Sequence, residues 1–278
     1  MTRQLDTINE IASDYDAIVL DQWGVLHDGT QPYGAAIDIL SELKAVGSRL
    51  AVLSNSGKRA APNADRIAAM GFQSDLLEHV MTSGEALWAD IQDQRIPGKR
   101  FYAIERLKGD ALVWARGLDI ELTQSLQDAD AILLMGLPDG SNLSDWTEVL
   151  EGALKTQMTV YCSNPDRQSP RAGCIVISPG ALGFAYRDIG GKTVFYGKPH
   201  EPIFRSLEKA LGTQKLLMVG DSLEHDISGG HAAGWDTLFV RGGLYADDFA
   251  QAGIDETLAR LCTAKSCAAP TYSIEVLK

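Results

Sequence analysis

Residues 17–29, AIVLDQWGVLHDG, decide the fold class of this chain. Four apolar residues run directly into Asp21, and Gly24 follows three positions later. Short, continuously apolar runs are typical of strands that are buried on both faces of a parallel sheet. Glycine permits an abrupt bend after such a strand and lets the backbone approach a ligand closely. The stretch therefore predicts a buried strand that brings a carboxylate to the edge of an α/β sheet.

Three more apolar runs follow the same plan and predict further strands of this sheet. They span residues 49–53, 216–219 and 237–240, and they end at Ser54-Asn55, Gly220-Asp221 and Arg241-Gly242. Helical periodicity over residues 34–46, 61–70, 202–211 and 227–233 lies between them, and each helical stretch ends in or near a glycine. Because ligands bind at the carboxyl ends of strands in open parallel sheets, the polar residues there are site candidates. The glycine-rich turn after residue 240 is instead predicted to be a structural loop.

A second set of strand and helix signals lies between residues 83 and 183. Strands are predicted over residues 101–104, 131–135 and 159–162. We therefore predict a core domain built from residues 1–82 and 184–278, and an inserted α/β domain over residues 83–183. Two domains also agree with the length of 278 residues.

Composition excludes several classes of partner. The 37 acidic residues outnumber the 25 basic ones and give a net charge of -12, which opposes non-specific binding to nucleic acid. The longest apolar stretch, residues 131–138, is too short to cross a bilayer, and residues 1–16 lack the apolar segment of a secretory signal. We expect a cytoplasmic protein that binds neither nucleic acid nor membrane, with its four cysteines reduced.

Two further carboxylates stand in the stretch GDSLEHDI, residues 220–227, after another apolar strand. Carboxylates gathered with Asp21 would repel one another, and a hard divalent cation such as Mg²⁺ relieves that repulsion. Asp221 and Asp226 are therefore candidate metal-site residues. An alternative is that they only cap the helix predicted to begin near residue 227, just as a single aspartate at a strand end is often a cap or turn former.

Two segments between these carboxylates suit a phosphate group. Ser54, Asn55 and Ser56 follow the second strand, where hydroxyl and amide groups at a helix start bind phosphate oxygens. Lys198, in Gly-Lys-Pro after a short predicted strand at residues 193–196, offers a positive charge. Taken alone, the first segment is also a common helix cap and the second a common turn.

In this order, and each at a strand end, the four segments resemble the four motifs of the haloacid dehalogenase superfamily. The insertion between the second and third segments resembles the class IIA cap domain of NagD-like and 4-nitrophenylphosphatase-like proteins. Residues 163–166, SNPD, and residues 178–181, SPGA, strengthen that placement. The resemblance covers residues 16–243 and implies a Rossmann-like parallel-sheet core with an inserted α/β cap.

The resemblance implies a Mg²⁺-dependent phosphatase that forms an aspartyl-phosphate. Asp21 would be the nucleophile and a metal ligand. Asp221 and the backbone carbonyl of Trp23 would be the other protein ligands of the metal. Asp226 would lie next to these ligands or contact water bound to the metal. The substrate would be a small phosphorylated metabolite.

By the same resemblance, Lys198 would neutralise charge on the nucleophile and the transferring phosphoryl group. Ser54, Asn55 and Ser56 would hold phosphate oxygens. Asn164 would contact the substrate from the cap, which is also implied to form a homodimer.

The chain departs from the family at Trp23. Phosphatases of the family carry a second aspartate there, which protonates the leaving oxygen, and such a group contributes roughly 10²–10⁴-fold in rate. Three explanations are open. In the first, His27 or Asp28 would protonate the leaving oxygen in place of the aspartate, or the leaving group would need no proton. Second, the chain would be a dehalogenase-like hydrolase, whose halide leaves unprotonated. Third, it would be a catalytically inactive protein that binds phosphate and metal for regulation; an indole that fills the pocket would favour this, and one in the core would not.

Overall fold

The computed structural model describes residues 2–171, 174–250 and 253–278, and the chain divides into two compact units. The first unit contains Met1–Ser54, Ala61–Met81 and Lys198–Lys278, and the second contains Asn55–Ala60 and Thr82–Gly197. Each unit is built on a parallel sheet with helices, so the predicted α/β class is confirmed. Within the described residues, no helix is both long and apolar enough to cross a membrane.

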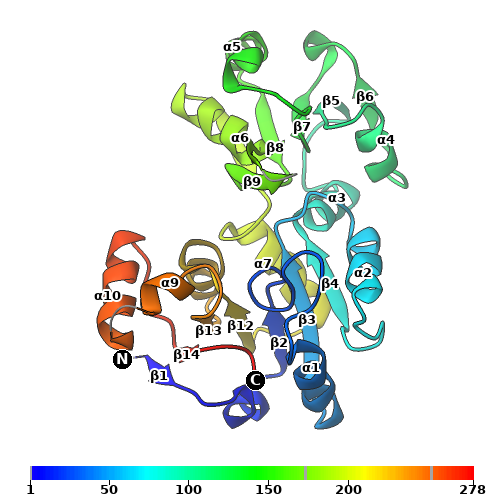
Figure 1. Cartoon of the computed structure of the whole chain (residues 1–278). Coiled ribbons are helices and arrows are strands. Elements are labelled where there is room, and N and C mark those ends of the chain that lie inside the picture. The colour runs from blue at the N-terminus through cyan, green and yellow to red at the C-terminus, as the bar shows by residue number, and fades with distance from the viewer. Residues whose placement is uncertain (1, 172–173, 251–252) are drawn as a thin grey trace. The chain divides into compact units, whose positions relative to one another are not determined.

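A seven-stranded sheet forms the centre of the first unit (Figure 1). Its order is β1 (Arg3–Gln4), β14 (Tyr272–Ile274), β13 (Asp236–Val240), β12 (Leu216–Gly220), β2 (Ala17–Leu20), β3 (Arg49–Ser54) and β4 (His79–Thr82). The five pairings from β1 across to β3 are parallel. All four strands that the apolar runs predict for this sheet, β2, β3, β12 and β13, are present.

The order of the strands reverses around β2. Its neighbour along the chain, β3, lies on one side, and β12, about two hundred residues later, lies on the other. Leu20 is in register with Val52 of β3 and with Val219 of β12, so the three strands end at one edge. Such a reversal leaves space for a ligand at the carboxyl ends of the strands.

The helices of the first unit end where the glycines predict. Its main helices are α1 (Ala36–Ala45), α2 (Ala60–Ala69), α7 (Glu201–Leu211), α8 (Ser228–Ala232), α9 (Ala246–Phe249) and α10 (Ile254–Ala264). Gly47, Gly71, Gly212 and Gly234 follow α1, α2, α7 and α8 with φ of 92°, 101°, 69° and 79°, the left-handed conformation of a C-terminal cap. A π-helical turn, Leu223–Ile227, precedes α8.

The two ends of the described chain also join this sheet, which the sequence did not predict. Strand β1 pairs with β14, and the 3₁₀ turn Ile8–Glu10 follows it. Ile8 and Ile11 are fully buried in the core with residues of β2 and β3. The segment before β2 therefore contributes to the hydrophobic core.

The second unit contains a five-stranded parallel sheet and an antiparallel hairpin. The sheet order is β11 (Lys192–Phe195), β8 (Thr159–Cys162), β7 (Ala131–Leu134), β5 (Arg100–Ile104) and β6 (Glu121–Thr123). The hairpin pairs β9 (Gln168–Arg171) with β10 (Cys174–Ile177), and the helices are α3 (Ser83–Gln92), α4 (Asp110–Trp114), α5 (Thr147–Lys155) and α6 (Pro179–Asp188). The sequence-based boundary after residue 183 falls inside α6, and the unit continues to Gly197 because β11 pairs with β8.

Candidate functional site

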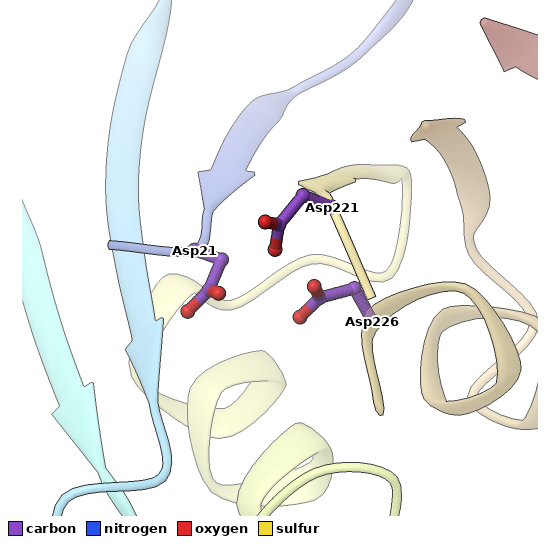
Figure 2. A group of neighbouring side chains, drawn as sticks. All are labelled: Asp21, Asp221 and Asp226. Carbon is purple, nitrogen blue, oxygen red and sulfur yellow. The ribbon is translucent and has the colours of Figure 1, made fainter. Parts of the chain in front are cut away.

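Three aspartates converge at the edge where β2 and β12 end. Asp21 follows β2, Asp221 follows β12, and Asp226 lies in the π-helical turn after Ser222. A carboxylate oxygen of each lies within 4.8 Å of one from the other two, and Figure 2 shows the carboxyl groups turned toward one another. The sequence prediction that these three side chains gather is therefore confirmed by the geometry.

Glycines allow this close packing. Gly24 has a φ of 76°, and a Cβ atom there would overlap with the Asp221 carboxylate, so the Trp23–Gly24 turn lies directly against that group. A Cβ atom on Gly220 would overlap with the side chain of Asp226. The glycine in each motif is thus required by the proximity of a carboxylate as well as by the bend of the chain.

Lys198 joins two of the carboxylates. Its side chain is only 3% exposed, and its Nζ donates to Asp21 Oδ1 and to Asp226 Oδ1, each at 2.6 Å. Burial disfavours the charged amine, but the two carboxylates outweigh it and raise the pKa of Lys198 above its ordinary value. Lys198 is therefore a fixed positive charge that touches the candidate nucleophile.

Asp221 has no such partner. Its Oδ2 accepts a 2.8 Å hydrogen bond from the backbone N–H of Leu244, and within the described residues it forms no ion pair. Burial, the charge of Asp226 and that of Asp21 raise the pKa of Asp221 to about 7. Burial also raises the pKa of Asp21, with Lys198 opposing that rise and Asp226 adding to it.

Three carboxylates, of which Asp221 and Asp226 are buried and Asp21 is half-buried, share one lysine and leave excess negative charge, and the oxygen donors fit a hard divalent cation. The alternative that these aspartates only cap a helix does not account for the arrangement. The cap of the π-helical turn is Ser222, whose side chain accepts from the His225 N–H at 3.2 Å. Asp226 Oδ2 accepts from the Ser222 N–H at 3.0 Å, while its other oxygen contacts Lys198. The turn thus supports Asp226 within the cluster, and π-helical turns are frequent at functional sites.

Trp23 is not in the core. Half of its surface is exposed, and its indole lies over Gly29, where a Cβ atom would overlap with the ring. The His27 ring packs against the indole edge-on, with centroids 5.8 Å apart and planes at 73°. The indole is therefore held in place at the surface of the first unit, two residues from Asp21.

Neither neighbouring group suits the role of proton donor. His27 is buried, its Nδ1 accepts from the Gly29 N–H at 3.0 Å, and its Nε2 lies 3.4 Å from Gln22 Oε1. Burial lowers the pKa of His27, and the charge of Arg66 lowers it further, so the ring is neutral and engaged in structure. Asp28 Oδ1 accepts from the backbone of the turn that follows it, which lowers the pKa of Asp28 to about 2. Asp28 is therefore ionised at neutral pH and cannot donate a proton.

Comparison with known proteins agrees with this geometry. A sequence model of the haloacid dehalogenase-like hydrolases matches residues 18–118, and a HAD-hydrolase-like model matches residues 195–262. Together the two matches include the segments that carry Asp21, Lys198, Asp221 and Asp226. The chain belongs to the haloacid dehalogenase-like hydrolases.

Solved structures and a characterised relative resemble this hydrolase over most of its length. A haloacid dehalogenase-like hydrolase from Brucella suis 1330 shares 26% identity, with a TM-score of 0.79, over 99% of this chain and 100% of that one. The D-glycerol 3-phosphate phosphatase of Mycobacterium tuberculosis is 27% identical over 85% of this chain, which spans 66% of that protein's length. A structure of a glycerol phosphate phosphatase from the same organism, in complex with magnesium, has a TM-score of 0.70 and 26% identity, covering 88% of this chain and 74% of that one.

The predicted phosphate-binding residues of this hydrolase divide between the two units. Ser54 ends β3, beside β2, and belongs to the first unit. Asn55 and Ser56 belong to the second, where Asn55 Nδ2 donates to Asp166 Oδ1 at 2.9 Å. Asn164 Oδ1 in turn accepts from the Asp166 N–H at 2.8 Å. Asn55 and Asn164 are therefore linked through Asp166.

The segments SNPD and SPGA, which strengthened the resemblance, pack together in the same unit. A Cβ atom on Gly180 would overlap with the carbonyl of Pro165. The Ser178 N–H donates to the Arg167 carbonyl at 3.0 Å. The start of α6 is thus fitted to the loop that carries Asn164.

Two parts of the site escaped the sequence analysis. Residues 241–243, predicted to be a structural loop, lie against Asp221: a Cβ atom on Gly243 would overlap with its carboxylate, and the next residue donates the Leu244 N–H. The glycine pair was the only available signal. The second is a network around the buried Gln22, whose Nε2 donates to Asn63 Oδ1 at 2.7 Å and whose Oε1 accepts from Arg66 at 2.9 Å. The only signal of this network in the sequence was Gln22, a polar residue in a motif that apolar residues flank.

Proposed function

We propose that this hydrolase is a Mg²⁺-dependent phosphatase of a small phosphorylated metabolite, in which Asp21 attacks phosphorus and forms an aspartyl-phosphate. The observation that carries the proposal is the pairing of Asp21 with Lys198 beside Asp221, a buried carboxylate without a cationic partner. The phosphatase relative in Mycobacterium tuberculosis supports the reaction class.

The proposed metal ligands are Asp21, Asp221 and the backbone carbonyl of Trp23, with Asp226 behind them. The bend at Gly24, which brings the Trp23–Gly24 turn against Asp221, supports this set. The magnesium complex of the related phosphatase supports the choice of ion. When bound, Mg²⁺ would offset the charge of the carboxylates and of the phosphate oxygens that approach them.

The other roles in binding and orienting the substrate are proposed for residues of the chain itself. The hydrogen bond from Lys198 to Asp21 Oδ1 fixes the rotation of the nucleophilic carboxyl group and supplies positive charge where the phosphoryl group arrives. Asp226 holds Lys198 in turn. Ser54, Asn55 and Ser56 are the proposed hydrogen-bond donors to the phosphate, and Asn164 is the proposed contact to the rest of the substrate.

No carboxyl or imidazole group next to Asp21 in sequence supplies a proton, since Trp23 cannot transfer one, His27 is engaged and Asp28 is ionised. The leaving oxygen then departs with little protonation. We therefore expect the rate to depend steeply on the acidity of the leaving alcohol, more so than in an enzyme with a positioned acid.

The test is a panel of phosphate esters with Mg²⁺, in which released phosphate is measured for the native chain and two Asp→Asn variants. Asp21→Asn is expected to abolish release. Asp28→Asn, which alters an exposed turn, is the matched control and is expected to retain it. If no ester gives release that depends on Asp21, the phosphatase proposal is wrong.

A second candidate function is binding of phosphate and metal without turnover, in a regulatory protein. The replacement of a proton donor by Trp23, without a substitute among its neighbours, favours it. Binding of Mg²⁺ and inorganic phosphate by calorimetry, together with no release that depends on Asp21, would identify it. Trp23→Asp then tests the missing group directly, because a rate increase of about 10²-fold or more would show that only the acid is lacking.

Self-association through the second unit and a cytoplasmic location stay predictions from the sequence. Light scattering of the purified chain tests the homodimer: a mass of one chain at micromolar concentration would contradict it.

A further inference from the structure

The last helix of the first unit ends in a cap that brings two cysteines together. Helix α10 runs from Ile254 to Ala264, and Ser266 after it takes a φ of 52°, in the left-handed region (Figure 1). The Cys267 N–H donates to the Cys262 carbonyl at 2.9 Å, and the Ser266 N–H donates to the Thr263 carbonyl at 3.2 Å. These two hydrogen bonds define a Schellman cap, in which the side chains at the positions of Cys262 and Cys267 commonly contact each other.

The surroundings of the two thiols agree with such a contact. Cys262 is buried, Cys267 is half-buried, and both pack in the apolar cluster that contains Phe239 and Leu258. Both sulfur atoms donate to one acceptor, the Ala268 carbonyl oxygen, which lies 4.0 Å from Cys262 Sγ and 3.1 Å from Cys267 Sγ. The two thiols therefore converge on one point of the cap.

The charge state of each thiol depends on its neighbours. Burial raises the pKa of Cys262 to about 11, and the charge of a Cys267 thiolate adds to that rise, which again requires the two sulfur atoms to be close. Burial also raises the pKa of Cys267, while its hydrogen bond with Ser228 opposes the rise and the charge of Glu224 adds to it. Both cysteines are therefore thiols at neutral pH, and they react through a small thiolate fraction.

Two adjacent thiols of unequal exposure suit thiol–disulfide exchange. A small-molecule disulfide such as glutathione disulfide can reach the half-buried Cys267 before the buried Cys262. The Cys267 thiolate attacks one sulfur of glutathione disulfide, whose S–S bond breaks, and the departing glutathione takes up the proton that Cys267 released. Cys262 then loses its proton and attacks the Cys267 sulfur, so that the mixed disulfide breaks and a second glutathione leaves with that proton. Two thiol hydrogens thus pass to two glutathione molecules as the disulfide between the cysteines forms.

We propose that Cys262 and Cys267 form a modification site, a dithiol that a small-molecule disulfide oxidises reversibly to an intramolecular disulfide across the cap of α10. This proposal does not depend on the phosphatase function of the carboxylate site. The structure holds the reduced form, in which all four cysteines are free. Disulfides that form transiently are the kind found in proteins of a reducing compartment, which agrees with the reduced state predicted from the sequence.

The cap is bonded to the π-helical turn that carries Asp226. Lys265 Nζ contacts Glu224 Oε1 at 2.6 Å, and the Cys267 side chain is hydrogen-bonded to Ser228. Glu224 lies within this turn and Ser228 directly follows it, at the start of α8. A disulfide between the two cysteines would therefore fix the end of α10 that is bonded to this turn.

Variants identify the order of attack. Cys262→Ser removes the second thiol, so Cys267 is expected to remain as a mixed disulfide with glutathione. Cys267→Ser removes the half-buried thiol, and Cys262 is then expected to react at least about tenfold more slowly than the native pair. Cys174→Ser changes an exposed cysteine of the second unit and is the matched control, which should oxidise at the cap as the native chain does. An unchanged rate in Cys267→Ser would contradict its role as the attacking thiol. Thermal unfolding identifies a variant that fails to fold, and the native chain with the other variant then carries the test.

The deciding experiment treats the whole folded chain with glutathione disulfide, blocks the remaining thiols with iodoacetamide and maps the tryptic peptides by mass spectrometry. Trypsin cuts between the two cysteines, so they fall in separate peptides, residues 261–265 and 266–278. We expect these peptides to be joined by a disulfide in most molecules, to come from a single chain on a non-reducing gel, and to separate when reduced glutathione is added in excess. Recovery of both cysteines as blocked thiols, or of Cys267 bound to glutathione beside a blocked Cys262, would overturn the proposal, as would joined peptides found only in a two-chain species.

Discussion

The two parallel sheets of this protein carry different polar side chains at the carboxyl ends of their strands. In the first unit, Asp21 and Asp221 follow neighbouring strands and meet Asp226 and Lys198 in a charged cluster that is buried except for the half-buried Asp21. In the second unit, β8 is followed by Ser163, which is buried and donates to the Leu134 carbonyl at 3.3 Å. In the loop after it, Asn164 Oδ1 accepts from the Asp166 N–H, and the Asp166 carboxylate accepts from Asn55 Nδ2.

The difference between the two edges lies in unbalanced charge and not in architecture. Both edges are carboxyl ends of parallel strands, the usual place for ligands. The second edge satisfies its polar groups locally. The first retains a carboxylate, Asp221, with one backbone hydrogen bond and two negative neighbours. We therefore propose that the chemistry takes place at the first edge and that the second contributes substrate contacts.

The largest effect is expected from removing the only lysine of the charged cluster. Lys198→Met leaves the buried Asp226 and the half-buried Asp21 without their cation, and losing one partner of a buried pair costs about 3–5 kcal/mol. Phosphate release should fall by about 10³-fold or more. Urea unfolding and a release assay measure both.

The matched change at the second edge is Ser163→Ala, which removes one hydrogen bond and should cost about 1 kcal/mol. If this variant is destabilised as much as Lys198→Met, the two edges do not differ in the way described.

A smaller effect should follow from adding a methyl group beside Asp221. Gly24→Ala places a Cβ atom into the Asp221 carboxylate at a φ of 76°, so we expect Mg²⁺ binding to weaken at least about tenfold, in addition to the backbone cost of roughly 1–2 kcal/mol. Gly47→Ala has a φ of 92° and no atom within 4 Å of the new Cβ, so it bears the backbone cost alone. Calorimetric titration with Mg²⁺ compares them. Equal affinities in the two variants would remove Gly24 from the metal site.

The charge of Asp221 should also appear in the pH dependence of metal binding. The pKa of Asp221 in the folded chain is about 7, above the ordinary value of 3.8. Protonated Asp221 therefore stabilises the metal-free fold fully below pH 3.8, and this contribution is lost as the pH rises through 7. Mg²⁺ binds the charged form. Its affinity should rise by about tenfold for each pH unit up to 7 and then level off.

The increase in melting temperature on adding Mg²⁺ should accordingly be larger at pH 8 than at pH 5.5, with sodium chloride of equal ionic strength as the control. A Mg²⁺ effect of the same size at both pH values would show that Asp221 is not a ligand.

The smallest effect is expected in the second unit. Asp166→Asn weakens the bond that holds the Asn55 amide without leaving a buried charge, so we expect KM to rise a few-fold while kcat stays within about twofold. Steady-state kinetics with one ester measure the split. A loss of kcat comparable with that of Lys198→Met would place the second edge in the chemistry.

Local patterns were enough to predict much of this protein. The apolar runs predicted β2, β3, β12 and β13, and the glycines that follow α1, α2, α7 and α8 take the predicted left-handed conformation. The position of Asp21 and Asp221 after two buried strands predicted that they meet, because parallel strands end at one edge. The strands and helix ends depend on periodicity and on single-residue conformational preferences, which act over a few neighbouring residues. The departure at Trp23 was visible only against the family that the motifs resemble.

Only the tertiary structure decided what surrounds those residues. The Leu244 N–H on Asp221, the engagement of His27 with Gln22, and the pairing of β1 with β14 join segments whose own patterns do not specify each other. The surface position of the Trp23 indole depends on Gly29 and His27. Such contacts follow from the packing of the whole chain and from the need of each buried polar group for a hydrogen-bond partner. The sequence pattern specifies only the helix, strand or turn in which each residue lies.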